Sequence, residues 1–158
     1  MHVFVTGATG WVGSAVVQDL IEAGHQVTGL ARSDDKAAEL AATGAKVVRA
    51  TLEDLDILHR TAGAADAVVH TAFNHDFSRF AENAEQDRRV IETLGSALEG
   101  SDRPLLVTAG LLGLTRGASE LEVASPASPR KSEAAARALI ERGVRAATVR
   151  LAPSVHGL

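Results

Sequence analysis

Cysteine and tyrosine are both absent from this chain of 158 residues, and aromatic residues make up only 3% of it. The absence of cysteine excludes disulfides, thiolate metal ligands and a cysteine nucleophile, and it fits a reducing compartment. The absence of tyrosine means that no phenol can serve as an acid or base. The two absences therefore limit which catalytic and metal-ligating side chains this protein can use.

Basic clusters and long apolar runs are missing as well. The net charge is −4 with acids and bases interspersed, so no basic surface is expected for nucleic acid. No apolar run approaches the roughly 20 residues that span a bilayer. The first strand-like run starts at His2 or Val3, which we take to leave no room for a signal peptide. We therefore expect a cytoplasmic protein without nucleic-acid or membrane partners.

The chain does contain a regular alternation of β-rich and helix-like stretches, at the length of one domain. Such alternation predicts a Rossmann-type doubly wound α/β fold, a parallel sheet with helices on both faces. We expect the strand order 3-2-1-4-5-6 and no separate substrate domain. The predicted strands are 2–6, 26–31, 46–50, 66–71, 105–108 and 146–151, and the predicted helices are 11–23, 34–40, 53–61, 78–98 and 132–141.

The stretch VFVTGATGWVGS joins the first strand to the first helix through Gly7, Gly10 and Gly13. A helix N-terminus carries about half a positive charge and free N–H groups, which together stabilise a pyrophosphate. Gly7 permits a tight turn, Gly10 lets phosphates approach the backbone, and Gly13 lets the helix pack against the strand. The turn therefore predicts a bound dinucleotide.

The spacing G-x-x-G-x-x-G in TGATGWVGS resembles the short-chain dehydrogenase/reductase superfamily, in particular its extended and atypical branch of NAD(P)-dependent epimerases and dehydratases. DAVVHTA (66–72), LLVTAGLLG (105–113) and VRLAPSVHG (149–157) are similar to further motifs of that family, in the same order. The resemblance implies a cofactor site across the ends of the strands. The implied contacts are Gly7, Thr9, Gly10, Trp11, Val12, Gly13, Leu52, Thr71, Ala72, Phe73, Pro153 and Val155.

Arg32 and Ser33 follow the second predicted strand, where NAD enzymes place an acid for the ribose 2′-hydroxyl. A guanidinium and a hydroxyl suit a 2′-phosphate, so we predict NADP as cofactor, with NAD as the alternative. Asp34 and Asp35 can reach the ribose instead. We prefer the interpretation that they favour the N-terminus of a helix.

Catalysis in the resembled family uses a tyrosine, a lysine four residues later and a nearby serine or threonine. Here Pro129 and Glu133 fall at the tyrosine and lysine positions, and Lys131 is two residues out of register. Thr108 matches the serine or threonine position, where it either bonds a substrate oxygen or bonds the backbone. We predict Thr108 and Lys131 as the catalytic residues.

Two other clusters are less informative. His70, His75 and Asp76 lack the spacing of metal ligands, so no metal site is predicted. The acids of the long helix, among them Glu85 and Asp87, are interpreted as a solvated helix face.

Three functions remain open. The preferred one is an atypical NADP-linked oxidoreductase or epimerase-like enzyme with a small carbonyl or sugar-like substrate. The others are a non-catalytic NAD(P) sensor or regulatory module and a structural domain with an empty cleft. We expect residues 1–158 to form one NAD(P)-binding domain without the family's C-terminal substrate region. The long helix at 78–98 suggests a homodimer in which it pairs with its copy.

Overall fold

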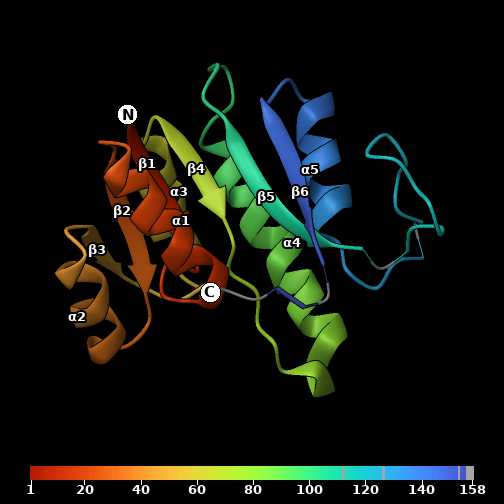
Figure 1. Ribbon diagram of the computed structural model, residues 1–158. Coiled ribbons are helices and arrows are strands. Elements are labelled where there is room, and N and C mark those ends of the chain that lie inside the picture. Colours follow the sequence, from red (N-terminus) through yellow and green to blue (C-terminus); the bar gives the residue numbers. More distant parts are fainter. Residues whose placement is uncertain (112, 126, 153, 156–158) are drawn as a thin grey trace.

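Six parallel strands form a single sheet in the order β3-β2-β1-β4-β5-β6, as the sequence predicts (Figure 1). The structure is a computed structural model that describes residues 1–158 except 112, 126, 153 and 156–158. Pro153, a predicted cofactor contact, therefore lies outside the described residues. The strands are β1 His2–Thr6, β2 Gln26–Ala31, β3 Lys46–Arg49, β4 Ala67–His70, β5 Leu105–Gly110 and β6 Ala146–Leu151.

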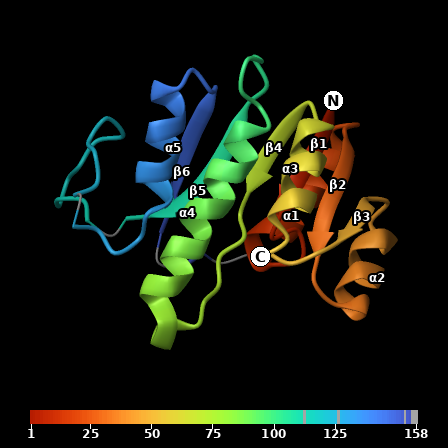
Figure 2. The same cartoon turned by 180° about the vertical axis from the view of Figure 1, so that it is seen from behind.

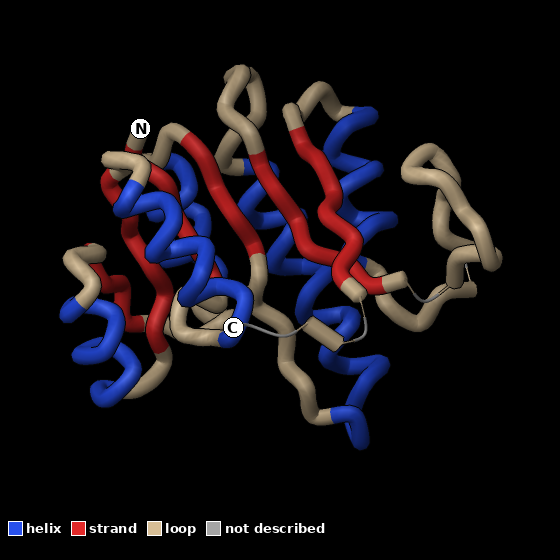
Figure 3. Tube along the Cα trace, viewed as in Figure 1, coloured by secondary structure: helices blue, strands red, loops and turns tan. Residues whose placement is uncertain are grey.

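Helices cover both faces of the sheet (Figures 1 and 2). The first two helices lie on one face and the last three on the other, as right-handed crossovers in a doubly wound sheet require. Loops join each strand to its helix at the same edge, which collects the carboxyl ends of the strands (Figure 3). The helices are α1 Trp11–Glu22, α2 Asp34–Ala42, α3 Leu55–Gly63, α4 Phe80–Ser96 and α5 Ser132–Glu141, with a 3₁₀ turn, η1 Phe77–Arg79, before α4.

Each face of the sheet has its own apolar core. Phe4 of β1 packs with Leu94 and Leu139 on the α3–α5 side, and all three side chains are fully buried. Val5 of β1 belongs to the core on the α1–α2 side, together with Val17. Alternate residues of the strands thus fill two layers, which fixes the register of the parallel sheet.

The sheet is less covered at β5 and β6. In the described part of the chain no helix lies over these two strands on the α1 side (Figure 1). Leu106 and Val149 on these strands are accordingly 38% and 39% exposed. No helix among the described residues is long and apolar enough to cross a membrane.

Several boundaries differ from the predicted ones for local reasons. β5 continues to Gly110 because it pairs with β6 along its full length, up to Leu151. The long helix begins as a 3₁₀ turn, since the Asp76 carboxylate accepts from the Ser78 N–H. Gly63 does not stop α3 but is its last residue.

Candidate functional site

The glycine turn between β1 and α1 is closed so tightly that side chains are excluded from it. Gly7 has a φ of +68°, and a Cβ there would lie 2.6 Å from the backbone nitrogen of Ala72. A Cβ on Gly13 would overlap the carbonyl oxygen of Gly7. The N–H of Gly10 closes the turn by donating to that same carbonyl at 2.9 Å. The turn therefore needs glycine at these positions to bring α1 against β1 and β4.

Among the described residues, no side chain caps the free N–H groups at the N-terminus of α1. Its N-cap is Gly10, which has no capping side chain, and its first turn contains no acid. In α2, by contrast, Ser33 accepts from the Lys36 N–H and the first turn contains Asp34 and Asp35. The N–H groups at the start of α1 are thus oriented to bind an anion.

The predicted cofactor residues around the turn do come together. Thr71 follows β4 and donates its hydroxyl to the Thr6 carbonyl oxygen at 2.8 Å, which holds the end of β4 beside β1. Ala72 then contacts the glycine turn. Trp11, the first residue of α1, is 67% exposed at the rim, and it is the single tryptophan of the chain. Thr9 and Val12 are half-buried in the same turn.

Two guanidinium groups lie at the neighbouring ends of β2 and β3. Arg32 is exposed and forms no ion pair among the described residues. Arg49, at the end of β3, pairs with the carboxylate of Asp34 at 3.0 Å. Asp34 and Asp35 both lie in the first turn of α2, in the helix N-terminal role that we preferred for them.

A cavity of about 210 Å³ lies between the loop after β3 and helix α4, lined by Leu52, Glu53, Leu55, Gln86 and Arg89. Leu52, one of the implied cofactor contacts, is thus part of the wall of this cavity. The preceding Thr51 is engaged elsewhere: its backbone N–H and hydroxyl both donate to Asp54, at 2.7 and 2.8 Å. These bonds lower the pKa of Asp54.

The two predicted catalytic residues each have a partner of their own. The Thr108 hydroxyl, almost buried at the end of β5, donates to the His70 carbonyl oxygen at 3.1 Å. The Lys131 ammonium pairs with Glu85 of α4 at 2.9 Å. Hydrogen bonds from Arg88 and from Lys131 lower the pKa of Glu85 to about 2. The catalytic assignments of Thr108 and Lys131 stay predictions.

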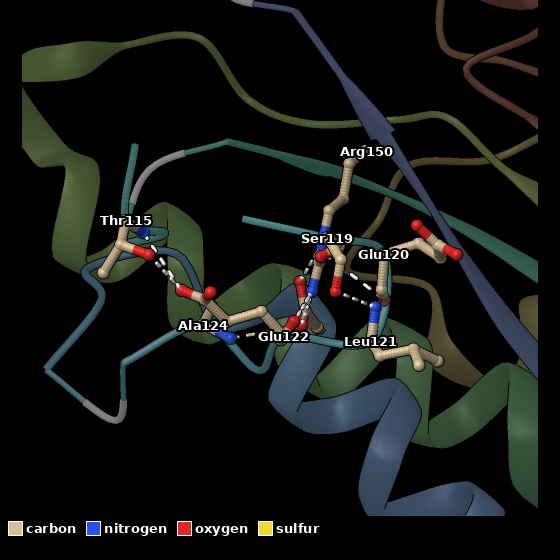
Figure 4. Close-up of polar contacts among 8 residues, drawn as sticks. Thr115, Ser119, Glu120, Leu121, Glu122, Ala124 and Arg150 are labelled. Atoms are coloured by element: carbon tan, nitrogen blue, oxygen red, sulfur yellow. Dashed lines mark hydrogen bonds and ion pairs between the residues drawn. The ribbon is translucent and has the colours of Figure 1, made fainter. Parts of the chain in front are cut away.

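Glu133, which falls at the family's lysine position, forms a half-buried ion pair with Arg150 of β6. Its carboxylate accepts from the guanidinium at 2.6 and 3.0 Å, and this pairing lowers its pKa. Arg150 also donates to the carbonyl oxygens of Ser119, Glu120 and Glu122 in the connection from β5 to α5 (Figure 4). The pair therefore anchors this connection, which the sequence predicts to be irregular, to the edge of the sheet.

A buried polar network lies beneath the predicted site. His70 bonds the Thr6 hydroxyl through Nδ1 at 2.7 Å and the Asp87 carboxylate through Nε2 at 3.0 Å. Ser132, at the start of α5, donates to the other oxygen of Asp87 at 2.5 Å. Arg130 donates through Nε to the Ser132 hydroxyl at 2.9 Å. These five residues are called the polar network below.

The interpretation of Asp87 as part of a solvated helix face was wrong, because Asp87 is only 1% exposed. The sequence did contain a signal for this. Asp87 lies three residues before Val90 and four before Ile91, both fully buried, so helical spacing places it on the apolar side of α4. An acid on the buried side of a helix needs a polar partner, which here is His70.

Among the described residues, no group of three or more histidine, aspartate or glutamate side chains is arranged so that it could hold a metal ion. His70 bonds Thr6 and Asp87, and His75 contacts aromatic rings.

Residues 7–152 match a family described as NAD(P)H-binding. The chain belongs to this NAD(P)H-binding family. An uncharacterized protein of Schizosaccharomyces pombe is 45% identical over 99% of the chain and 55% of its own length. A 2-alkyl-3-oxoalkanoate reductase of Shewanella oneidensis is 41% identical over 71 residues, which are 45% of the chain and 18% of that protein. The chain thus spans about half the length of the Schizosaccharomyces pombe protein.

A structure of UDP-glucose 4-epimerase from Thermus thermophilus in complex with NAD has the same fold. It superposes with a TM-score of 0.76 at 22% identity, over 95% of this chain and 54% of the epimerase. These findings confirm the Rossmann-type fold and the membership of the NAD(P)H-binding family, in keeping with the resemblance to the extended or atypical short-chain dehydrogenase/reductase superfamily. They also support a nicotinamide dinucleotide as the cofactor of this NAD(P)H-binding protein.

Proposed function

We propose that this NAD(P)H-binding protein is an NADP(H)-dependent oxidoreductase that acts on a small carbonyl compound. The observation that carries the proposal is the glycine turn, in which a Cβ at Gly7 or Gly13 is excluded and the N-terminus of α1 has no side-chain cap. The N–H groups of Trp11, Val12 and Gly13 would hold the pyrophosphate. When bound, the dinucleotide supplies the site with a hydride donor or acceptor.

The preference for NADP rests on the tip of β2. Arg32 and Ser33 would bind the 2′-phosphate, because the guanidinium is free of ion pairs among the described residues and phosphate accepts from its fork of N–H groups. Arg49 lies on the neighbouring strand, where it is paired with Asp34. Leu52 would pack on the adenine ring from the cavity beside it.

Thr108 and one relative support a carbonyl compound as the substrate. Thr108 lies at the carboxyl end of β5, where its hydroxyl can turn from the His70 carbonyl oxygen to a substrate oxygen. The relative from Shewanella oneidensis is a reductase of 3-oxoalkanoates by name. Its similarity covers less than half of the chain, so it suggests a reaction type for this protein rather than a substrate.

A second function, an NADP(H) sensor without turnover, is favoured by the residues at and near the family's catalytic positions. The chain has no tyrosine. Glu133, at the family's lysine position, and Lys131, two residues before it, are paired with Arg150 and Glu85, respectively. A protein that only binds the dinucleotide needs neither residue free.

Titration of the cofactors tests the proposal. The fluorescence of the single tryptophan, Trp11, reports on the turn directly, and NADP⁺, NADPH, NAD⁺ and NADH are compared. We expect Arg32→Ala to weaken NADPH about tenfold or more, as the loss of a charged hydrogen bond implies, and to leave NADH unchanged. The exposed Arg137 of α5 provides the control, Arg137→Ala, which should change neither affinity.

Two results would separate the alternatives. Equal affinity of wild type and Arg32→Ala for NADPH would contradict the preference for NADP, and no binding of any of the four would contradict the proposal altogether. Tight NADPH binding without oxidation across a panel of ketones, oxo acids and aldehydes would favour the sensor.

A further inference from the structure

Arg130 carries a positive charge beside Thr108, one of the predicted catalytic residues. It is half-buried, yet it forms no ion pair with a carboxylate in the part of the chain that the structure describes. Its partners are neutral: the Ser132 hydroxyl at 2.9 Å, the Thr108 carbonyl oxygen at 3.4 Å and the ring of Phe73, 4.1 Å from Cζ to centroid. The other half-buried guanidinium of this region, Arg150, is paired with Glu133. A guanidinium that is withdrawn from water without a carboxylate in direct contact can be stabilised by the carboxylate of a ligand.

The location of Arg130 places this charge at the reacting end of the predicted site. Its contacts with Thr108 and Phe73 put the guanidinium at the carboxyl ends of β5 and β4. Phe73 directly follows Ala72, which contacts the glycine turn. Arg130 also follows Pro129, the residue at the family's tyrosine position. A ligand at Arg130 would therefore lie at the same edge of the sheet as the dinucleotide.

An aromatic shelf adjoins the guanidinium. It consists of Phe73, His75, Phe77 and Phe80, whose neighbouring ring centroids lie 5.5 to 6.3 Å apart. Three of the four phenylalanines of the chain are in this short stretch between β4 and α4. Phe77 is 71% exposed, so the shelf offers apolar surface to a ligand rather than to the core.

Hydrogen bonds within the polar network hold the side chain of Arg130 in this position. Ser132 accepts from its Nε and donates to Asp87, which also bonds His70. Burial lowers the pKa of Arg130, and the negative charge of Asp87 opposes the shift. A guanidinium stays protonated in proteins, so Arg130 is a fixed positive charge rather than an acid.

We propose that Arg130 binds the carboxylate of an organic acid whose apolar part lies on the aromatic shelf. This deepens the proposed function, on which it rests: the carbonyl substrate would be an oxo acid, with Arg130 as a specificity-determining residue. The guanidinium fork matches a carboxylate in bidentate geometry, and the shelf supplies the apolar contact that a phosphate ion does not use.

The test measures binding of unreactive probes by calorimetry, with and without saturating NADP⁺. The probes are octanoate, its neutral counterpart octanamide, acetate and inorganic phosphate. We expect wild type to bind octanoate about tenfold or more tightly than octanamide, from the charge-assisted bonds to Arg130. Arg130→Gln should abolish this preference, Arg130→Lys should keep part of it, and the exposed control Arg137→Gln should keep all of it.

A second variant covers the case in which Arg130→Gln fails to fold. Phe77 is exposed, so Phe77→Ala should fold normally; we expect it to weaken octanoate several-fold and to leave acetate unchanged. Equal binding of octanoate and octanamide by wild type, or phosphate binding tighter than octanoate, would overturn the proposal. So would an Arg130→Gln protein that keeps the octanoate preference but loses NADP⁺.

The two proposals fail in different ways. If the Trp11 titrations detect no dinucleotide, the proposed function fails, while octanoate binding through Arg130 is still measured without cofactor. If NADPH binds but octanoate does not depend on Arg130, only the present inference fails.

Discussion

The glycine turn and the polar network adjoin each other at Thr6, and they are built in opposite ways. The turn consists of neighbouring residues, 7–13, and its functional groups are backbone N–H groups without side-chain partners. The polar network joins β1, β4, α4 and α5, and its hydrogen bonds satisfy each buried side chain that takes part. Indeed, no buried side-chain nitrogen or oxygen lacks a partner among the described residues.

The difference shows which part of the sheet edge is arranged for a ligand and which part supports it. Unsatisfied donors at a surface turn are stabilised by a bound anion, whereas a satisfied buried network stabilises the fold and fixes the side chains above it. Changes in the turn should therefore alter cofactor affinity most, and changes in the network should alter the free energy of unfolding most.

Gly13→Ala should have the largest effect. The new Cβ would overlap the Gly7 carbonyl oxygen and push α1 away from the turn. We expect NADPH affinity to fall about a hundredfold or more, since the N–H groups lose their alignment, and the free energy of unfolding to fall by about 2 kcal/mol. Trp11 fluorescence titration and urea unfolding measure the two effects.

Gly63→Ala is the matched control, because Gly63 is also helical but a Cβ there would meet nothing within 4 Å. Its expected effect is an unchanged NADPH affinity and a free energy of unfolding higher by up to about 1 kcal/mol, from helix propensity. Retained NADPH affinity in Gly13→Ala would mean that the close packing of the turn does not create the site.

Asp87→Ala should lower the free energy of unfolding strongly and change NADPH affinity only a little. It leaves His70 and Ser132 without their shared buried acceptor, which we expect to lower the free energy of unfolding by about 3 kcal/mol. NADPH affinity should change less than about threefold, because no network side chain belongs to the turn's anion site. Urea unfolding and the Trp11 titration again measure both quantities.

Glu92→Ala on the same helix serves as the comparison, since Glu92 is paired with Arg88 at the surface and its loss should cost at most about 0.5 kcal/mol. A loss of NADPH affinity in Asp87→Ala as large as that in Gly13→Ala would show that the two regions are not separable.

The sequence was sufficient for most of the fold, because alternating strand and helix patterns are local. All six strands and the strand order were predicted. The ends of elements were less predictable where pairing decides them. β5, for example, extends to Gly110 only because β6 provides a partner there.

Within the candidate site, the glycine turn could be predicted from the sequence, whereas the polar network could not. The glycine turn was readable because its residues are consecutive and each spacing has a steric meaning. The polar network was missed because its bonds join distant residues, such as His70 to Thr6 and Ser132 to Asp87. The stacking of Arg130 on Phe73 has no local sequence signal at all. Only Asp87 could have been identified, from its position in the buried stripe of α4.

The smallest expected effect concerns the Glu133–Arg150 pair, which anchors the connection between β5 and α5 and lies in neither region. Arg150 holds the pKa of Glu133 below its usual value of 4.5. The pair therefore stabilises the folded state fully above pH 4.5, and the contribution disappears as the pH falls through the lowered pKa. We expect Glu133→Gln to lower the free energy of unfolding by about 1 kcal/mol at pH 7, since the pair is partly exposed.

That deficit relative to wild type should shrink as the pH is lowered from 5 to 3, because wild-type Glu133 then becomes neutral as well. Urea unfolding across this pH range measures it. Lys36→Gln, which removes an exposed pair with Glu39, should show no comparable deficit at pH 7. A Glu133→Gln deficit that stayed constant with pH would mean that shape and packing, not charge, hold the connection. NADPH affinity should be the same in the Glu133→Gln and Lys36→Gln variants. The Glu133–Arg150 pair joins α5 to β6, and β4 and β5 separate β6 from β1 and its glycine turn (Figure 1).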